Sequence, residues 1–223
     1  MAAPPDQAQS VLDFLAGAET GFFVEVGPGR VGSHSAALEE RGWSGVLVEP
    51  QPDLAAFLVT ARSAQVFAVA CVAPDRAGQS VSLRVASATG AAPYLVLVPG
   101  RTLGDILNEA EAPTPIDALI IDAAGHESAV LAGCDFDHWQ PRLILLRDRL
   151  ETLRAHRSLR GQGYRLIRRQ DGDTVYVPAG APIRPDRGLR WRVFREYHLG
   201  APRRWTRAAL RRLRHGMAMS AAD

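Results

Sequence analysis

Continuous hydrophobic runs alternate along this chain with segments whose apolar residues recur at helical spacing. The runs are bounded by turn residues and predict buried strands at 21–27, 45–50, 64–73, 116–123 and 141–148. The segments between them predict helices at 10–18, 33–42, 52–62, 102–110, 127–134 and 150–163. Strands that alternate with helices in this way predict a parallel sheet covered on both faces.

Two other parts of the pattern complete the predicted fold. Residues 80–87 alternate as a solvent-facing strand should, and a Gly- and Pro-bearing loop is expected before residue 102. Short runs at 164–169 and 174–178, joined by Gln-Asp-Gly-Asp, predict a terminal antiparallel hairpin. The prediction is an α/β fold with a Rossmann-like, doubly wound, mostly parallel sheet, in which a domain at residues 1–178 precedes an extension at 179–223.

Composition supports one sizeable domain. The chain has 223 residues, of which 47% are hydrophobic and 22% charged, as in ordinary globular proteins. It shows neither a secretory signal nor an apolar run long enough to span a membrane, so a cytoplasmic protein is expected. The spacing of Cys71 and Cys134 matches no metal or redox motif, and the lack of lysine excludes a lysine Schiff base and a P-loop lysine.

Charge is distributed unevenly. Residues 184–215 hold 11 arginines and two acids, a net charge of +9, so the rest of the chain carries −7. Around Trp205 the arginines, except Arg212, and the apolar residues fall on opposite arcs of a helix. Such a helix is expected to dock on its own acidic body or on a second subunit of a homo-oligomer. Second in rank is an anionic lipid or glycolipid at the inner membrane face, and nucleic acid ranks last.

The loop after the first predicted strand has the pattern of a cofactor site. In "GFFVEVGPGRVGSHS" the glycines Gly27, Gly29 and Gly32 match G-x-G-x-x-G, and an acid, Glu49, ends the next strand 22 residues after Gly27. Glycines there allow close backbone approach, and the acid can bind ribose hydroxyls. The pattern suits both NAD and S-adenosylmethionine.

Glu25, which precedes the first glycine, favours one of these two cofactors. A carboxylate would repel the pyrophosphate of NAD but attract the ammonium and sulfonium groups of S-adenosylmethionine. An NAD-linked oxidoreductase remains the alternative, although the chain lacks a Tyr-x-x-x-Lys pair.

A second group of polar residues follows a later strand. Asp122 ends the run at 116–123, and His126 and Glu127 begin the next helix, so all three are expected at the ligand-binding edge of the sheet. Histidine titrates near neutral pH and suits a general base for a hydroxyl. The three could also ligate a metal, but their spacing follows no metal motif, so none is predicted. His34 is expected only to line the loop, and Trp139 to pack.

Three segments together resemble the FkbM family of S-adenosylmethionine-dependent methyltransferases. They are "GFFVEVGPGRVGSHS", "GWSGVLVEPQP" and "IDALIIDAAGHESAVLAGCDFDHWQPRLILLRD", and the resemblance spans about residues 20–178. The shared features are the acid-x-Gly loop, Gly-Trp-x-Gly at 42–45, Glu-Pro at 49–50, Ile-Asp-x-x-Gly-x-Glu at 121–127 and Leu-x-Gly at 131–133.

The resemblance implies a cofactor, a reaction and site residues. The cofactor would be S-adenosylmethionine, and the reaction O-methylation of a sugar, a glycan or a small hydroxylated acceptor. The implied cofactor-binding residues are Glu25, Gly27, Pro28, Gly29, Gly32, Glu49, Pro50, Cys71 and Val72. Among these, Glu25 and the glycines would hold the amino-acid end, Glu49 the ribose, and Cys71 with Val72 the adenine. The implied catalytic residues are Asp122, His126 and Glu127.

This sequence departs from the family pattern at two places. The family commonly has an acid where Ala124 stands, and a Gly-Ala-Asn type loop where Pro28, Gly29 and Arg30 follow Gly27. The first departure removes a carboxylate from the expected site. The further alternative is therefore a degenerate methyltransferase domain that serves as a binding module and is tethered by its basic tail.

Overall fold

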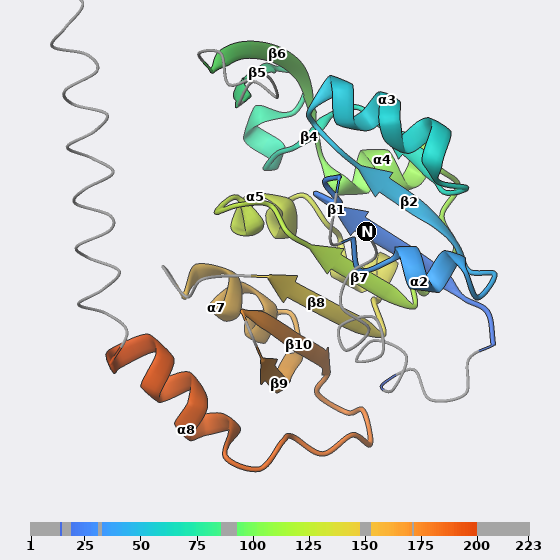
Figure 1. Cartoon of the computed structure of the whole chain (residues 1–223). Coiled ribbons are helices and arrows are strands. Elements are labelled where there is room, and N and C mark those ends of the chain that lie inside the picture. The colour runs from blue at the N-terminus through green and yellow to red at the C-terminus, as the bar shows by residue number, and fades with distance from the viewer. Residues whose placement is uncertain are drawn as a thin grey trace, which may run out of the picture.

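A mostly parallel sheet forms the centre of the computed structural model, which describes residue 14 and residues 19–30, 33–85, 93–147, 153–170 and 172–199 (Figure 1). The strand order is β3-β2-β1-β7-β8-β10-β9. Its strands are β1 (Phe22–Val26), β2 (Ser44–Val48), β3 (Gln65–Phe67), β7 (Ala118–Ile121), β8 (Leu143–Arg147), β9 (Tyr164–Gln170) and β10 (Asp173–Pro178). The first five pair in parallel, whereas β10 is antiparallel to both of its neighbours. The predicted doubly wound sheet and terminal hairpin are confirmed.

Helices cover both faces of this sheet. They are α2 (Ala36–Glu39), α3 (Pro52–Ala61), α4 (Leu103–Glu109), α5 (Glu127–Ala132), α6 (Phe136–Trp139), α7 (Arg154–Gly161) and α8 (Leu189–Phe194). One core cluster joins the sheet to α4, α5, α6 and α7, and a second joins its other face to α2 and α3. Alternation decides which face each strand residue meets: Val24 belongs to the first cluster and Phe23 to the second.

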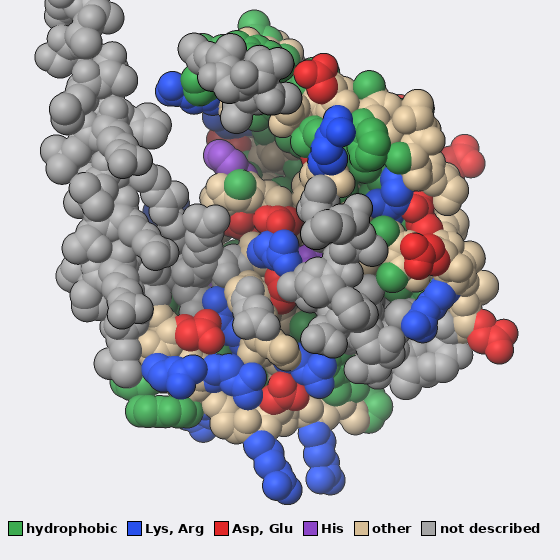
Figure 2. Space-filling model, in the orientation of Figure 1, with side chains coloured by type: hydrophobic (Ala, Val, Ile, Leu, Met, Phe, Trp, Pro, Cys, Tyr) green, Lys and Arg blue, Asp and Glu red, His purple; other side chains and the backbone are tan. Residues whose placement is uncertain are grey.

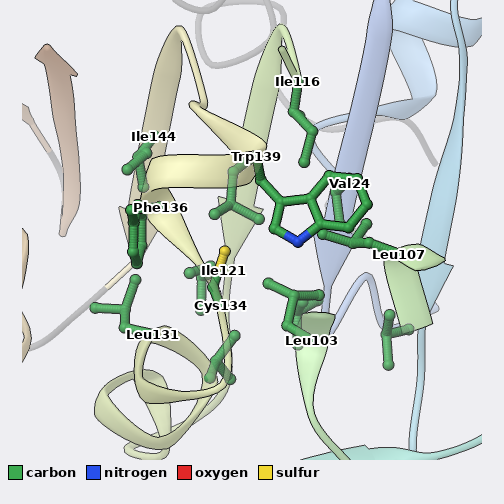
Figure 3. Close-up of a cluster of buried hydrophobic side chains, with 14 of the residues drawn as sticks. Val24, Leu103, Leu107, Ile116, Ile121, Leu131, Cys134, Phe136, Trp139 and Ile144 are labelled. Carbon is green, nitrogen blue, oxygen red and sulfur yellow. The ribbon is translucent and has the colours of Figure 1, made fainter. Parts of the chain in front are cut away.

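Trp139 lies at the centre of the first cluster. Its ring packs among Leu103, Leu107, Ile116 and Val24, and 3% of the residue is exposed (Figure 3). Burying each large apolar side chain of this kind contributes about 1.5–3 kcal/mol. The packing role predicted for Trp139 is confirmed.

The sequence pattern was misread on one side of the sheet. The strand predicted at 64–73 breaks into β3 and β4 (Ala70–Cys71), and β4 leaves the main sheet. The segment expected to be a loop contains β6 (Tyr94–Arg101), which pairs with β4 in parallel and with β5 (Ser80–Val85) in antiparallel orientation. Pro99 and Gly100 suggested a turn, but they lie at the end of a strand whose Tyr-Leu-Val-Leu-Val run favours pairing.

The helix expected at 33–42 is a single turn. Its N-cap is Ser35, and the hydroxyl of Ser33 bonds to Glu25. Gly42, three residues after the helix ends at Glu39, has a φ of +83° and donates its N–H to the carbonyl of Glu39. The helix predicted at 10–18, apart from Phe14, and the helix around Trp205 lie outside the described residues.

The segment that follows β10, residues 179–186, covers the outer edge of β9. The N–H of Asp186 donates to the carbonyl of Ile167 at 2.8 Å, and Arg165 donates to the carbonyl of Ala179 at 3.0 Å. These contacts occupy an edge that would otherwise be open to strand pairing. The chain then enters α8, which continues as a π-helical turn at Arg195–Leu199. Nowhere in the described chain is a helix both long and apolar enough to cross a bilayer.

Candidate functional site

Polar residues gather where β1, β2, β7 and β8 end. Glu25 lies on β1, Glu49 and Asp122 directly follow β2 and β7, and Arg147 ends β8. Because Phe23 packs toward α2, Glu25, two residues later, faces the same way. Figure 2 shows acidic, arginine and histidine side chains together beside a hollow, where Figure 1 places this edge of the sheet. The carboxyl edge of a doubly wound sheet is its usual ligand site.

Glu25 holds the turn before α2 against β1. One carboxylate oxygen accepts the N–H of His34 at 2.9 Å, and the other accepts the hydroxyl of Ser33 at 2.6 Å and the N–H of Ser35 at 3.2 Å. The hydroxyl of Ser35 donates to the same oxygen, and Glu25 is 1% exposed. Its contacts therefore give it a structural role, and direct contact with a cofactor's amino group stays a prediction.

Arg62 supports this arrangement from the C-cap of α3. Its guanidinium donates to the hydroxyls of Ser33 and Ser35, each at 2.8 Å, and forms an ion pair with Glu39. The two serines thus link a buried carboxylate to a cation. Such compensation is needed because an isolated buried charge is strongly destabilising.

The two described glycines of the loop have different surroundings. Gly27 has a φ of +82°, and a Cβ there would lie 2.2 Å from the carbonyl oxygen of Asp122, so β1 and β7 approach each other closely at this point. Gly29 has a φ of +60°, and no atom lies within 4 Å of where its Cβ would be. Pro28 is buried and Pro50 half-buried, while Gly32 lies outside the described residues. Gly29 therefore leaves room for a ligand beside the backbone.

Glu49 and Gly29 are brought together by this fold. The N–H of Gly29 donates to Oε2 of Glu49 at 3.1 Å, and the N–H of Gln51 donates to Oε1 at 3.0 Å. Glu49 is 5% exposed, and its burial raises the pKa of the carboxyl, although the two backbone hydrogen bonds oppose the shift. The carboxylate has acceptor capacity beyond these two bonds.

Asp122 lies next to a cation that the sequence analysis did not select. Its Oδ2 is 3.4 Å from Nη1 of Arg147, whose Nε is 2.9 Å from Oδ1 of Asp173. Burial raises the pKa of the Asp122 carboxyl, and the charges of Arg147 and of His34 act in the opposite direction. A carboxylate with a raised pKa and a free oxygen suits proton transfer.

His34 is more deeply placed than a loop-lining residue would be. It is 1% exposed, and neither ring nitrogen has a hydrogen-bond partner in the part of the chain that the structure describes. Buried polar atoms are nearly always paired, so these two nitrogens are available to a ligand or a water.

His126 and Glu127 lie at the start of α5. His126 is exposed at the N-cap of α5 and forms no side-chain cap, and Oε1 of Glu127 accepts the N–H of Gly125 at 2.8 Å. Asp122 is paired with Arg147. Among the described residues no three His, Cys, Asp or Glu side chains are placed to share a metal. The catalytic roles of His126 and Glu127 stay predictions.

Cys71 ends β4 of the small sheet and Val72 follows it, bonded to Arg101 of β6, which corrects their expected place in the third strand of the main sheet. Val72 is buried and Cys71 partly so. Burial raises the pKa of the Cys71 thiol, and of the free Cys134 thiol, to about 12, so both remain protonated at neutral pH. Contact of Cys71 and Val72 with adenine stays a prediction.

Two arginines of the site, Arg147 and Arg62, were not selected in the sequence analysis, and only the first could have been. Arg147 is a charged residue that ends a predicted buried strand, and the reasoning that selected Asp122 applies to it equally. Arg62 carries no comparable signal, because nothing in the pattern relates the end of α3 to the serines before α2.

A family model covers most of this chain. The model of the "Methyltransferase FkbM domain" matches residues 16–166. No curated protein matches the chain. A TehB-like SAM-dependent methyltransferase from Corynebacterium glutamicum is 10% identical with a TM-score of 0.45, over 77% of this chain and 87% of that chain.

Two further solved structures are similar at the same level. A precorrin-6y C5,15-methyltransferase from Geobacter metallireducens is 13% identical with a TM-score of 0.41, over 78% of this chain and 89% of that chain. MnmC2 from Aquifex aeolicus is 14% identical with a TM-score of 0.39, over 84% of this chain and 62% of that chain. The family match spans more than half of the sequence and includes the glycine loop, Glu49 and Asp122, and on this ground the chain belongs to the FkbM methyltransferase family.

Proposed function

We propose that this chain transfers a methyl group from S-adenosylmethionine to a hydroxyl oxygen of a sugar, a glycan or a small hydroxylated acceptor. The observation that carries the proposal is the hydrogen bond between Gly29 and Glu49, because it combines an open glycine loop with a buried carboxylate at the carboxyl edge. Membership of the FkbM family supports the reaction type. The choice of a sugar rests on the family resemblance alone.

The residues of this edge fit S-adenosylmethionine. Glu49 can accept hydrogen bonds from ribose hydroxyls, and the open space beside Gly29 admits a ligand. Asp122 and Asp173 add negative charge, and Arg147 is already paired with both. Arg30, next to Gly29, lies over the Phe57 ring at 4.7 Å from its centroid. This charge distribution attracts an ammonium and a sulfonium and disfavours a pyrophosphate.

Asp122 is the group we place at the acceptor. S-adenosylmethionine, when bound, supplies a methyl group on a cationic sulfur that accepts the electron pair of the broken bond. Arg147 fixes Oδ2 of Asp122 and so leaves Oδ1 to take the proton of the acceptor hydroxyl. The raised pKa of Asp122 makes it a stronger base than an ordinary aspartate. Correct alignment of the hydroxyl supplies several kcal/mol more, on the order of the values seen for positioned reactants.

His34 would complete the site as a positioning residue. Its backbone N–H is held by Glu25, so its ring position is set by the same network that orders the turn. Either unpartnered ring nitrogen can bond to a bound ligand or to a water beside Asp122. His126, at the exposed start of α5, is placed to contact the outer part of an acceptor.

Calorimetric titration with S-adenosylhomocysteine, with NAD in parallel, tests the cofactor assignment. We expect micromolar binding of the first and none of the second. The reaction is then tested by transfer of a radiolabelled methyl group from S-adenosylmethionine to a panel of glycans and small polyols. Asp122→Asn should retain binding and lose about 100-fold or more in transfer rate. Binding of NAD in place of S-adenosylhomocysteine, or full transfer by Asp122→Asn, would contradict the proposal.

A further inference from the structure

The outward face of α8 carries two large aromatic side chains. Trp191 is 62% exposed and Phe194 47%, and their rings stack with centroids 5.7 Å apart and planes at 20°. Single exposed apolar residues are common, whereas two adjacent exposed aromatic rings form a contiguous apolar area. Nothing in the proposed methyl transfer requires them.

Arginines flank this pair on the same side. Arg187 and Arg190 precede Trp191 by four and one residues, Arg195 directly follows Phe194, and all three are exposed, as is Arg184. Within the described residues, none of these four arginines pairs with an acid. Figure 2 shows arginine side chains gathered along the lower edge, with hydrophobic side chains beside them, where Figure 1 places α8. The surface therefore carries uncompensated positive charge beside apolar area.

The inner face of the same segment is tied to β9. Leu189 is buried, Arg192 donates to the carbonyl of Arg169 at 3.0 Å, and Glu196 is 2.6 Å from the guanidinium of Arg169. Asp186 pairs with Arg168 at 3.3 Å. Both acids of the segment thus face the body of the protein. The helix is anchored on one side, and its aromatic and basic side is exposed.

We propose that this α8 surface, formed by Arg184, Arg187, Arg190, Trp191, Phe194 and Arg195, docks on a membrane with anionic phospholipid headgroups. Arginine binds phosphate with two parallel hydrogen bonds, and tryptophan and phenylalanine insert at headgroup level. Lasting attachment needs both an apolar and an electrostatic contribution, and the surface offers both. The sequence that follows is also basic, with six arginines and one acid in residues 200–223.

A nucleic acid is the less suitable partner for this surface. Proteins that bind single strands combine a basic groove with aromatic rings on which successive bases stack. Here the rings of Trp191 and Phe194 stack on each other, and the four arginines are spread along residues 184–195, with only Arg190 of the four inside α8. A flat anionic surface can meet all of these side chains at once.

Vesicle co-sedimentation of the full chain, without cofactor, is the first test. We expect binding to vesicles of phosphatidylcholine mixed with phosphatidylglycerol, little binding to phosphatidylcholine alone, and release at high salt. Equal binding to both vesicle types, or none to either, would overturn the proposal. Because no cofactor or acceptor is present, this outcome is independent of the methyltransferase assignment.

A charge-matched pair of variants locates the surface. Arg187→Ser/Arg190→Ser should lower the partition coefficient on anionic vesicles by about 10- to 30-fold, as expected for two arginines near a charged bilayer. Arg76→Ser/Arg84→Ser removes the same charge at exposed positions near the other end of the molecule and should change it less than about 3-fold. Equal losses in both variants would show a general charge effect and overturn the assignment to α8.

Fluorescence quenching by brominated phosphatidylcholine in the anionic vesicles tests the aromatic pair. In a Trp205→Phe background the remaining tryptophans are Trp191, Trp43 and Trp139, of which the last two are 2% and 3% exposed. Quenching that disappears in Trp191→Phe supports insertion of this residue. Unquenched emission with vesicles bound, or binding of single-stranded RNA in place of vesicles through Arg187 and Arg190, would refute it.

Discussion

The backbone N–H of Gly29 lies 3.1 Å from Oε2 of Glu49 and donates a hydrogen bond to it. One contact thus joins the loop after β1 to the residue after β2, 20 positions later in the sequence. It couples the two loops that a nucleotide-like cofactor would contact. A substitution in one loop should therefore shift the position of the other.

Replacing Glu49 should weaken cofactor binding. Glu49→Ala removes the acceptor for ribose hydroxyls and releases Gly29, so the affinity for S-adenosylhomocysteine should fall by about 10- to 150-fold, the equivalent of 1.5–3 kcal/mol. Calorimetric titration measures this. Glu40→Ala, at an exposed position of the same charge, serves as the control and should bind like the unmodified protein. An unchanged dissociation constant for Glu49→Ala would refute the ribose assignment.

Glu49 should also impose a pH dependence on stability. Burial raises its pKa above the ordinary value of 4.5, so the folded protein binds this proton more tightly than the unfolded chain does. The contribution of Glu49 to the free energy of unfolding is then fully present below pH 4.5 and declines as the pH rises through the raised pKa.

Glu49→Gln lacks this titration and isolates the effect. The unmodified protein should lose stability relative to Glu49→Gln as the pH rises from 4 toward 7, with urea unfolding as the measurement. Asp122, whose pKa is also raised, is present in both proteins and cancels in the difference. A stability difference that is constant, or that changes in the opposite sense, would contradict the burial of an ionisable carboxyl here.

The loop glycines should differ in what they tolerate. Gly27→Ala forces a Cβ to within 2.2 Å of the carbonyl oxygen of Asp122 at a φ of +82°, so it should lower the free energy of unfolding by about 3 kcal/mol or more. Gly29→Ala meets open space and should lose only about 1 kcal/mol from its φ of +60°. Urea unfolding measures both, and equal losses would show that β1 and β7 are not in close approach at Gly27.

The central fold was accessible from the sequence because its strands are buried on both faces. Such strands appear as uninterrupted apolar runs, and the residue after each run marks the carboxyl edge, which located Glu49 and Asp122. The hairpin partner β6 was missed because Pro99 and Gly100 resemble a turn when its pairing with β5 is unknown.

Contacts that form only in three dimensions were not accessible in this way. Arg62 reaches Ser33 across 29 residues, and no periodicity records that distance. The direction of Glu25 was readable in principle, because it lies two positions after the core residue Phe23 and so faces α2. The expectation that Glu25 contacts the ligand rested only on its place before the glycine loop. The alternation of side chains along β1 predicts its direction better.

The position where the family commonly has an acid is strained in this protein. Ala124 has a φ of +50°, a conformation that alanine adopts at a disadvantage of about 1–2 kcal/mol and that aspartate and asparagine tolerate better. Ala124→Gly removes this strain but adds freedom to the unfolded chain. The expected result is a gain of about 0.5–1 kcal/mol in the free energy of unfolding and a Tm higher by roughly 2 °C.

The same change at exposed Ala77, whose φ is −59°, serves as the control and should instead lower the free energy of unfolding by about 0.4–1 kcal/mol. Thermal unfolding of the two variants measures the contrast, and a loss of stability in Ala124→Gly would show that the turn between Asp122 and α5 is not strained at this residue.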